Sequence, residues 1–265
     1  MSYRFIDVKK DGRLLIMTID RPEVMNAISP AVSHEMSQAL DVFEADEQLW
    51  VAIITGAGSD AFSAGGDISV MSKAEVADDY QMPATGYAGI TARKSCNKPI
   101  IAAVNGVCFG GGFEVALACD LIVASENARF ALPEPRIGSA AVAGGIHRLV
   151  REVGLKSAMA LMLTGDSIDA AKAKEMGLVM ETVAEGQALE AAIRVAERLL
   201  RCAPLALRAT KECAVNGSAY PSVFDALDAQ DRGVFSSLQT MLLSQDIREG
   251  LDAFVSKRRP TWRGV

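Results

Sequence analysis

The hydrophobic and polar positions of the chain change their period along its length. In the first 185 residues, short apolar runs rich in β-branched residues alternate with segments whose apolar residues recur every three or four positions. The first pattern is typical of buried strands and the second of amphipathic helices. After Gly186 only the helical period remains. The chain is therefore predicted to form an α/β core over residues 1–185 and a helical region over residues 186–265.

Turn and cap residues place the elements more closely. Strands at 4–10 and 13–19 flank Asp11-Gly12, a dipeptide that favours a two-residue hairpin turn. Ser29-Pro30 supplies an N-cap and a first-turn proline for a helix over 31–44. Further strands are predicted at 50–55, 98–104, 121–125, 129–132 and 178–183. Further helices are predicted from about residue 90 to the strand at Pro99, and over 146–153, 155–163, 170–176, 188–201, 204–215, 223–243 and 245–258.

The pattern breaks down between residues 72 and 89. This segment is polar and contains Pro83 and Gly86. It predicts a mobile loop or a frayed helix, placed to act as a lid over a ligand. Tyr80, Met82 and Tyr87 either line a ligand pocket or pack as ordinary loop side chains, and the sequence leaves both interpretations open.

Two glycine corners each follow a strand-like run, one at Gly65-Gly66 and one at Gly110-Gly111-Gly112. Glycines let other atoms approach the main chain closely, and a helix start leaves backbone N–H groups without partners. Two such N–H groups, one from each corner, can bind a single carbonyl oxygen. They would stabilise the negative charge that the oxygen gains during a reaction.

Two glutamates accompany these corners. Glu114 stands two residues after the last glycine, in the first turn of a predicted helix, and Glu134 follows twenty residues later. That separation allows the chain to return to the same cleft. Taken alone, Glu114 is equally well explained as a residue that favours the helix dipole. Glu134 lies between Pro133 and Pro135 and by itself is better explained as a surface turn residue.

Composition narrows the class of protein. The 265 residues are half hydrophobic, enough for a large core, and the net charge of −6 argues against nucleic acid as a partner. No apolar run of about 18 residues and no signal-peptide core are found, so no membrane association is expected. The five scattered cysteines fit a reducing cytoplasm, where we expect the protein to be located.

The sequence lacks the residues that several kinds of catalytic, metal and nucleotide-binding site require. Only two histidines occur, which disfavours a Ser-His-Asp triad or a His-rich metal site, and no metal is expected. The nucleophile elbow and the P-loop signature are both missing. Gly56-Ala-Gly58 begins like a dinucleotide fingerprint, but Ala61 occupies the place of the third glycine. Redox chemistry with a nucleotide cofactor is therefore disfavoured.

Four segments, in this order along the chain, resemble the crotonase (enoyl-CoA hydratase/isomerase) superfamily. They are Ala64-Gly-Gly-Asp-Ile68, Lys98-Pro-Ile-Ile-Ala-Ala-Val-Asn-Gly106, Gly110-Gly-Gly-Phe-Glu114 and Phe130-Ala-Leu-Pro-Glu134. No single segment is decisive, but the ordered set is specific. Ala52-Ile-Ile-Thr-Gly56 and the closing Lys257-Arg-Arg-Pro-Thr-Trp-Arg-Gly264 are also similar to the carnitinyl-CoA dehydratase branch.

The resemblance implies a crotonase-like (ClpP/crotonase) spiral of repeated ββα units, with C-terminal helices used to form a trimer or a hexamer of two trimers. It implies an acyl-CoA substrate whose thioester carbonyl lies between the N–H groups of Gly66 and Gly111. No separate cofactor is implied, because CoA is part of the substrate. The positions implied to bind substrate and CoA are Ala27, Ala64, Gly66, Asp67, Ile68, Ser69, Gly111 and Lys257.

Two of these positions carry a second interpretation. Asp67 is also a good turn cap that would shape the corner without touching ligand. Lys257, with Phe254, is implied to reach the CoA of the same or of a neighbouring subunit.

The reaction implied is the addition of water across the 2,3 double bond of a 2-enoyl-CoA, or the reverse dehydration. Hydration needs one group that activates water and one that protonates C2. We assign Glu114 as the base and Glu134 as the proton donor. A Δ3-Δ2 isomerase or a thioester hydrolase of the same fold is the alternative. The loop at 138–145 lacks the proline that many hydratases carry, and its small side chains indicate an unbranched or modestly bulky acyl group.

Overall fold

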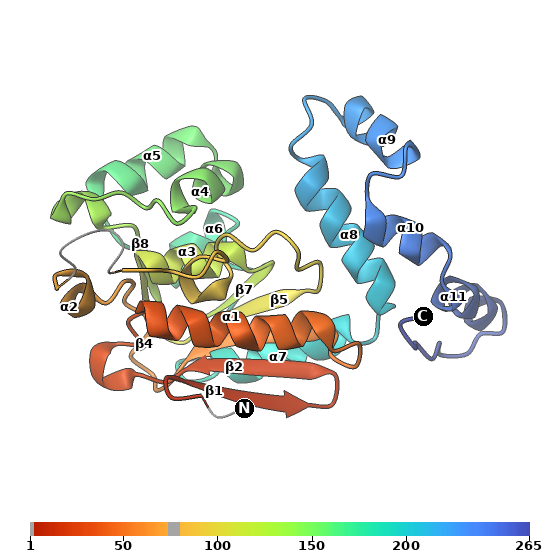
Figure 1. The fold of residues 1–265 in the computed structure, drawn as a ribbon, viewed down its shortest axis with the longest axis horizontal. Helices are drawn as coiled ribbons and strands as arrows, with labels where there is room; N and C mark the ends of the chain where they lie inside the picture. Colours follow the sequence, from red (N-terminus) through yellow and green to blue (C-terminus); the bar gives the residue numbers. More distant parts are fainter. Residues whose placement is uncertain (1–2, 74–79) are drawn as a thin grey trace.

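The computed structural model describes residues 3–73 and 80–265. Its centre is a six-stranded sheet in the order β1-β2-β3-β5-β7-β10 (Figure 1). Its strands are β1 (Ile6–Asp11), β2 (Leu14–Ile19), β3 (Val51–Gly56), β5 (Ile100–Val104), β7 (Leu121–Ser125) and β10 (Glu181–Val183). The hairpin β1–β2 is antiparallel, and the remaining neighbours are parallel.

A second, smaller sheet follows the first strand by strand. It contains β4 (Ala61–Ser63), β6 (Val107–Phe109), β8 (Arg129–Ala131) and β9 (Ile168–Asp169). β4, β6 and β8 run parallel and come directly after β3, β5 and β7. After each of the first two pairs a helix begins, α2 (Ile68–Met71) after β4 and α3 (Gly111–Ala118) after β6. The chain thus repeats a ββα unit and advances as a spiral, which confirms the predicted crotonase-like α/β fold.

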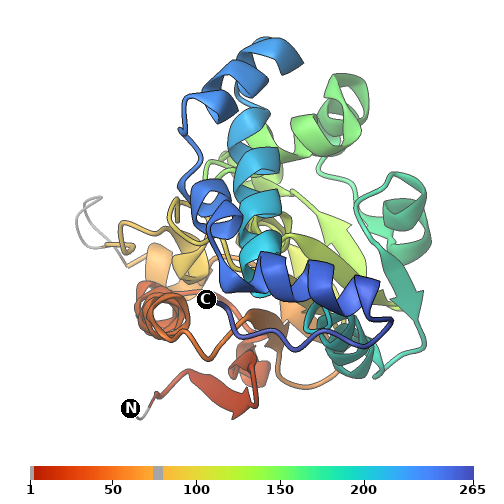
Figure 2. The same ribbon diagram turned by 90° about the vertical axis from the view of Figure 1, so that its right-hand side faces the viewer.

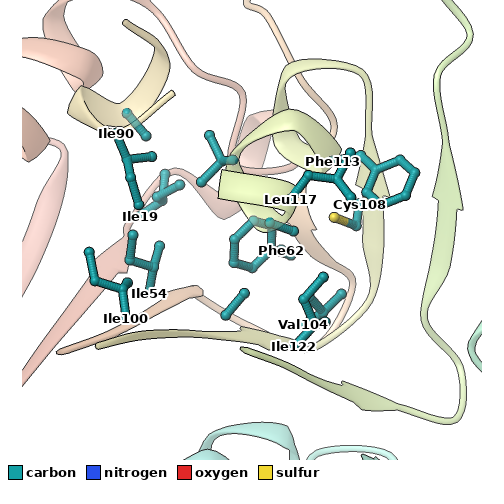
Figure 3. Close-up of a cluster of buried hydrophobic side chains, with 14 of the residues drawn as sticks. Ile19, Ile54, Phe62, Ile90, Ile100, Val104, Cys108, Phe113, Leu117 and Ile122 are labelled. Atoms are coloured by element: carbon teal, nitrogen blue, oxygen red, sulfur yellow. The ribbon is translucent and has the colours of Figure 1, made fainter. Parts of the chain in front are cut away.

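Two helices cover opposite faces of the large sheet. Alternate strand residues point to opposite sides, so each face has its own apolar cluster. α1 (Pro30–Ala45) packs on one face and α7 (Ala188–Leu199) on the other. On the α1 side, Phe62 from β4 and Phe113 and Leu117 from α3 fill the space above the strands (Figure 3). This packing holds α3, and hence the second glycine corner, against the core.

The remaining helices lie outside these layers. α4 (Gly145–Val153) and α5 (Leu155–Thr164) lie between β8 and β9 of the small sheet, and α6 (Ala170–Glu175) follows β9. α8 (Pro204–Gly217), α9 (Val223–Asp231), α10 (Ser236–Leu242) and α11 (Gln245–Val255) gather on one side of the core (Figure 1 and Figure 2). α7 packs on the sheet, although it belongs to the predicted helical region. The division at residue 185 stays a prediction.

The sequence predicted most elements but was wrong at three places. The helix predicted from about residue 90 to Pro99 does not form. Positive φ angles at Gly86, Ala88 and Gly89 turn the chain just before it instead. The helix predicted over 223–243 is two helices, separated near Gly233, whose φ is 75°. The hairpin loop is Gly12-Arg13, since Asp11 still pairs with Leu14.

Two further observations concern what surrounds the core. The lid predicted over 72–89 lies partly outside the described residues, which omit 74–79. In the part that is described, Tyr87–Gly89 forms a short 3-10 turn. None of the described helices is both long enough and apolar enough to cross a bilayer.

The contact between α3 and β4 can be tested at Gly112. A Cβ at this position would lie 2.8 Å from the Cβ of Ser63 and would overlap the Ser63 carbonyl oxygen. We expect Gly112→Ala to lower the free energy of unfolding by about 1–3 kcal/mol, because the main chain of β4 must shift. Gly217→Ala is the control, since a Cβ there has nothing closer than 3.9 Å. Equal stability of both variants in denaturant titrations would contradict this account.

Candidate active site

The two predicted glycine corners meet in the structure. Gly65 has φ 101° and Gly110 has φ 51°, conformations that disfavour other residues. A Cβ on Gly65 would lie 2.8 Å from the Phe109 carbonyl oxygen and 3.1 Å from the Gly111 nitrogen. A Cβ on Gly111 would lie 3.6 Å from the Gly66 nitrogen. The main chains therefore approach so closely that the first corner has no room for a side chain.

Their N–H groups are available to a ligand. Gly66 forms an isolated parallel bridge with Ile28, in which Ile28 donates to the Gly65 oxygen at 2.7 Å and Asp67 donates to the Ile28 oxygen at 3.0 Å. Gly111 is the first residue of α3. In the described part of the chain, no residue accepts a hydrogen bond from the N–H of Gly66 or of Gly111. Two unpartnered donors side by side can hold one oxygen anion. We call this pair the glycine clamp.

Asp67 braces the first corner. Its Oδ2 forms an ion pair with Arg21 Nη2 at 2.9 Å, and its Oδ1 accepts from Ser69 Oγ at 2.6 Å. It also caps α2 by accepting from the Val70 N–H. Burial acts to raise the pKa of Asp67, but the hydrogen bonds from Ser69 and Arg21 hold it below its ordinary value. These are the contacts of a turn cap, the second of the two interpretations offered by the sequence.

Glu114 projects from the first turn of α3 into a buried space. It is 3% exposed, and its Oε1 accepts from the Gly145 N–H at 2.8 Å. Burial raises the pKa of Glu114 to about 7, and nearby Glu134 adds to the rise. The Gly145 N–H and the positive charge of Arg148 oppose it. Glu114 is therefore poised to gain or lose a proton near neutral pH.

Glu134 reaches the second corner from the 3-10 turn Glu134–Ile137. Its Oε1 lies 3.1 Å from the position that a Cβ on Gly110 would take. Its Oε2 is buried and has no hydrogen-bond partner in the described residues. Burial raises the pKa of Glu134 as well. A buried, unpartnered carboxyl oxygen is costly unless it serves a ligand, and this favours a functional role for Glu134 over the surface-turn interpretation.

The other predicted positions divide into two groups. Those close in sequence to the first corner lie around it, with Ala27 buried and Ile68 and Ser69 exposed on α2. Ala64 is also exposed, and its N–H donates to the Met25 oxygen. Lys257 follows α11, which lies at the opposite end of the molecule from α2 (Figure 1). Within one chain the structure does not bring Lys257 to the glycine clamp.

Two features of the site could not be assigned from the sequence. Gly145 is the hydrogen-bond partner of Glu114, although the loop at 138–145 was interpreted only as a substrate-facing segment. The ring of Tyr87 contacts the glycine clamp, a position left open between pocket lining and packing. No residue pattern signals either contact, because each joins segments far apart in the chain. Among the described residues, no group of three or more metal-ligating side chains occurs.

A fold of ββα turns with a glycine clamp, a buried glutamate and a half-buried one defines a class of protein. The chain belongs to the enoyl-CoA hydratase/isomerase family, the crotonases, whose family model matches residues 9–265. Named enzymes match over its whole length, and the chain is an enzyme of the hydro-lyase type.

Individual relatives place it within that family. The carnitinyl-CoA dehydratase of Escherichia coli K12 is 40% identical over 259 residues, which covers 98% of each chain. A crystal structure of enoyl-CoA hydratase from Mycobacterium tuberculosis H37Rv is 38% identical, with a TM-score of 0.88 over 98% of this chain and 99% of that one. An enoyl-CoA hydratase from Bacillus anthracis is 30% identical, with a TM-score of 0.90 over 99% and 100%.

The raised pKa of Glu114 predicts a cost in stability at high pH. The folded state binds its proton more tightly than the unfolded state, so this contribution to stability is lost as pH rises from about 4.5 to about 7. Glu114→Gln removes the titration. Between pH 5 and pH 8, we expect the wild type to lose about 2–3 kcal/mol relative to this variant.

Denaturant titrations of both proteins at the two pH values measure this difference. Glu185→Gln, which changes an exposed glutamate, is the control and should track the wild type at both pH values. A pH-independent gap between wild type and Glu114→Gln would mean that Glu114 does not carry the raised pKa.

Proposed function

We propose that this enzyme adds water across the 2,3 double bond of a 2-enoyl-CoA, or removes water from the corresponding 3-hydroxyacyl-CoA. One observation carries the proposal: the buried carboxyl group of Glu114 and the half-buried one of Glu134 accompany a clamp of two N–H groups that have no partner among the described residues. Water addition to a thioester-conjugated alkene needs these parts. A double-bond shift can operate with a single acid.

The glycine clamp would act on the thioester carbonyl. That carbonyl withdraws electrons from the adjacent double bond, so that C3 becomes open to attack by water. As the bond from water to C3 forms, the electron pair of the double bond moves onto the carbonyl oxygen as an enolate. The N–H groups of Gly66 and Gly111 would hold that charge, and the loss of one such donor typically costs about 10²–10³ in rate.

The two glutamates would move the protons. Glu114, as the carboxylate, takes a proton from the attacking water, and Glu134, as the acid, gives one to C2. After one addition the proton must pass from Glu114 back to Glu134 before the next. Raised pKa values suit this exchange, because each group then holds or releases a proton near neutral pH.

The substrate proposal rests on the relatives and on the first corner. The Escherichia coli relative is named for carnitinyl-CoA, itself a 3-hydroxyacyl thioester, so dehydration of such a substrate belongs to the proposal. Ala27, Ala64, Ile68 and Ser69 surround the corner and would contact CoA, while Asp67 would hold the corner in shape. No cofactor beyond the CoA of the substrate is required, because the acids and the clamp supply each step.

Hydration is tested by the loss of conjugated-thioester absorbance with crotonyl-CoA and longer 2-enoyl-CoAs, and by its gain with carnitinyl-CoA. We expect Glu114→Gln and Glu134→Gln each to lower kcat by about 10²–10⁴ while CoA still binds, because each removes one proton-transfer group. Glu185→Gln is the matched control.

Each other outcome has a clear meaning. If Glu134→Gln retained the full rate, the two-acid mechanism would be wrong. If the wild type turned over none of these thioesters, the hydratase proposal would fail. Assays for double-bond migration and for release of free CoA would then test the isomerase and the hydrolase.

We also propose that the C-terminal helices join three chains. Their large apolar side chains are exposed in the single chain, for example Leu243 at 88%, Phe254 at 85% and Phe224 at 78%. Exposed apolar surface of this kind marks an interaction site. A trimer would also give Lys257 a route to the clamp of a neighbour. We expect a solution mass of three or six times the 28.1 kDa of the chain by light scattering, and a monomer mass would refute this assembly.

A further inference from the structure

The side chain of Tyr87 covers the glycine clamp. Its ring atoms Cδ1 and Cε1 each lie 3.1 Å from the position that a Cβ on Gly111 would take. Its hydroxyl oxygen lies 3.3 Å from the corresponding position on Gly66. The ring therefore spans both residues whose N–H groups would bind the thioester carbonyl.

The main chain that carries Tyr87 is fixed on both sides. The Tyr87 N–H donates to Thr91 Oγ1 at 3.0 Å. Ala88 is fully buried in the left-handed region, with φ 46°, and its N–H donates to Ser33 Oγ on α1 at 3.1 Å. Gly89 packs so closely on α1 that a Cβ would overlap the main chain of Ser37. Only rotation of the side chain can move the ring.

The hydroxyl of Tyr87 also has a neighbour. It lies close enough to the hydroxyl of Tyr80 for the two phenols to influence each other's pKa. Tyr80 in turn donates to the Ile28 oxygen at 3.2 Å, and Ile28 is the residue that bridges to Gly66. Burial raises the pKa of both phenols, so both stay neutral. The ring of Tyr87 is thus connected through Tyr80 and Ile28 to the corner at Gly66, against which it lies.

We propose that Tyr87 determines which acyl groups the site accepts, by placing its ring against C2 of the substrate. C2 is bonded to the carbonyl carbon, so a carbonyl oxygen held by Gly66 and Gly111 brings C2 next to the ring. Carbon atoms in contact need about 3.5–4.0 Å. A hydrogen at C2 needs less room than a methyl group, which would collide with the ring unless the side chain rotated away. The preferred substrate class is therefore 2-enoyl-CoA without a branch at C2, an inference that rests on the proposed function.

The test compares crotonyl-CoA with 2-methylcrotonyl-CoA on the wild type, Tyr87→Phe and Tyr87→Ala. For the wild type we expect kcat/KM to be at least about 100-fold higher on crotonyl-CoA, the upper end of what one methyl group gives in a tight pocket. Tyr87→Phe keeps the ring and should keep most of this ratio. Tyr87→Ala should reduce it below about 10-fold. A ratio unchanged in Tyr87→Ala, or no discrimination by the wild type, overturns the inference.

A binding experiment separates this inference from the proposed function. Calorimetry gives the Kd values of butyryl-CoA, isobutyryl-CoA and free CoA for each protein, with no turnover required. We expect the wild type to bind butyryl-CoA more tightly than isobutyryl-CoA, and Tyr87→Ala to lose this preference with free CoA binding unchanged. If the wild type hydrates nothing but shows this pattern, only the reaction is wrong. Equal affinities for the two acyl-CoAs in the wild type overturn the role of Tyr87.

Discussion

The close approach of two main-chain corners is the constraint on which the rest of the site depends. Gly65 and Gly110 adopt positive φ angles, and a Cβ on Gly65 would collide with the Phe109 oxygen. Only because these side chains are missing can the N–H groups of Gly66 and Gly111 lie together without partners. The long strands, α3 and the Arg21–Asp67 ion pair all serve to hold that approach in place.

Burial around the clamp then determines the behaviour of the acids. Glu114 accepts from the main chain of Gly145, and Glu134 Oε2 has no partner among the described residues. Both carboxyls therefore resist ionisation, and their pKa values rise towards the range useful for proton transfer. The pKa of a carboxylate with several hydrogen-bond donors, such as Asp67, is lowered instead. The difference between a capping acid and a reactive acid here is the number of donors around it.

Local patterns predicted much of this arrangement. Period-two and helical spacing gave the long strands and most helices, because each depends on residues near in sequence. Both glycine corners and both glutamates were likewise recognised as sequence motifs. The short strands β6 and β9 were not predicted, since two or three residues are too few to show a period. The helix predicted from residue 90 was wrong, because the chain before it turns through the left-handed conformation of Ala88, whose N–H donates to Ser33 on α1.

The chemistry of the site depends on motifs that are local in sequence, whereas its selectivity depends on contacts between distant segments. Main-chain N–H groups have the same chemistry in every sequence, so glycine spacing suffices to suggest a clamp. Selectivity depends on which side chains face that clamp. One of them is Tyr87, which is carried by an irregular turn that contacts α1. The family match therefore defines the class of enzyme, whereas the acyl group on which it acts depends on side chains that the family motifs do not include.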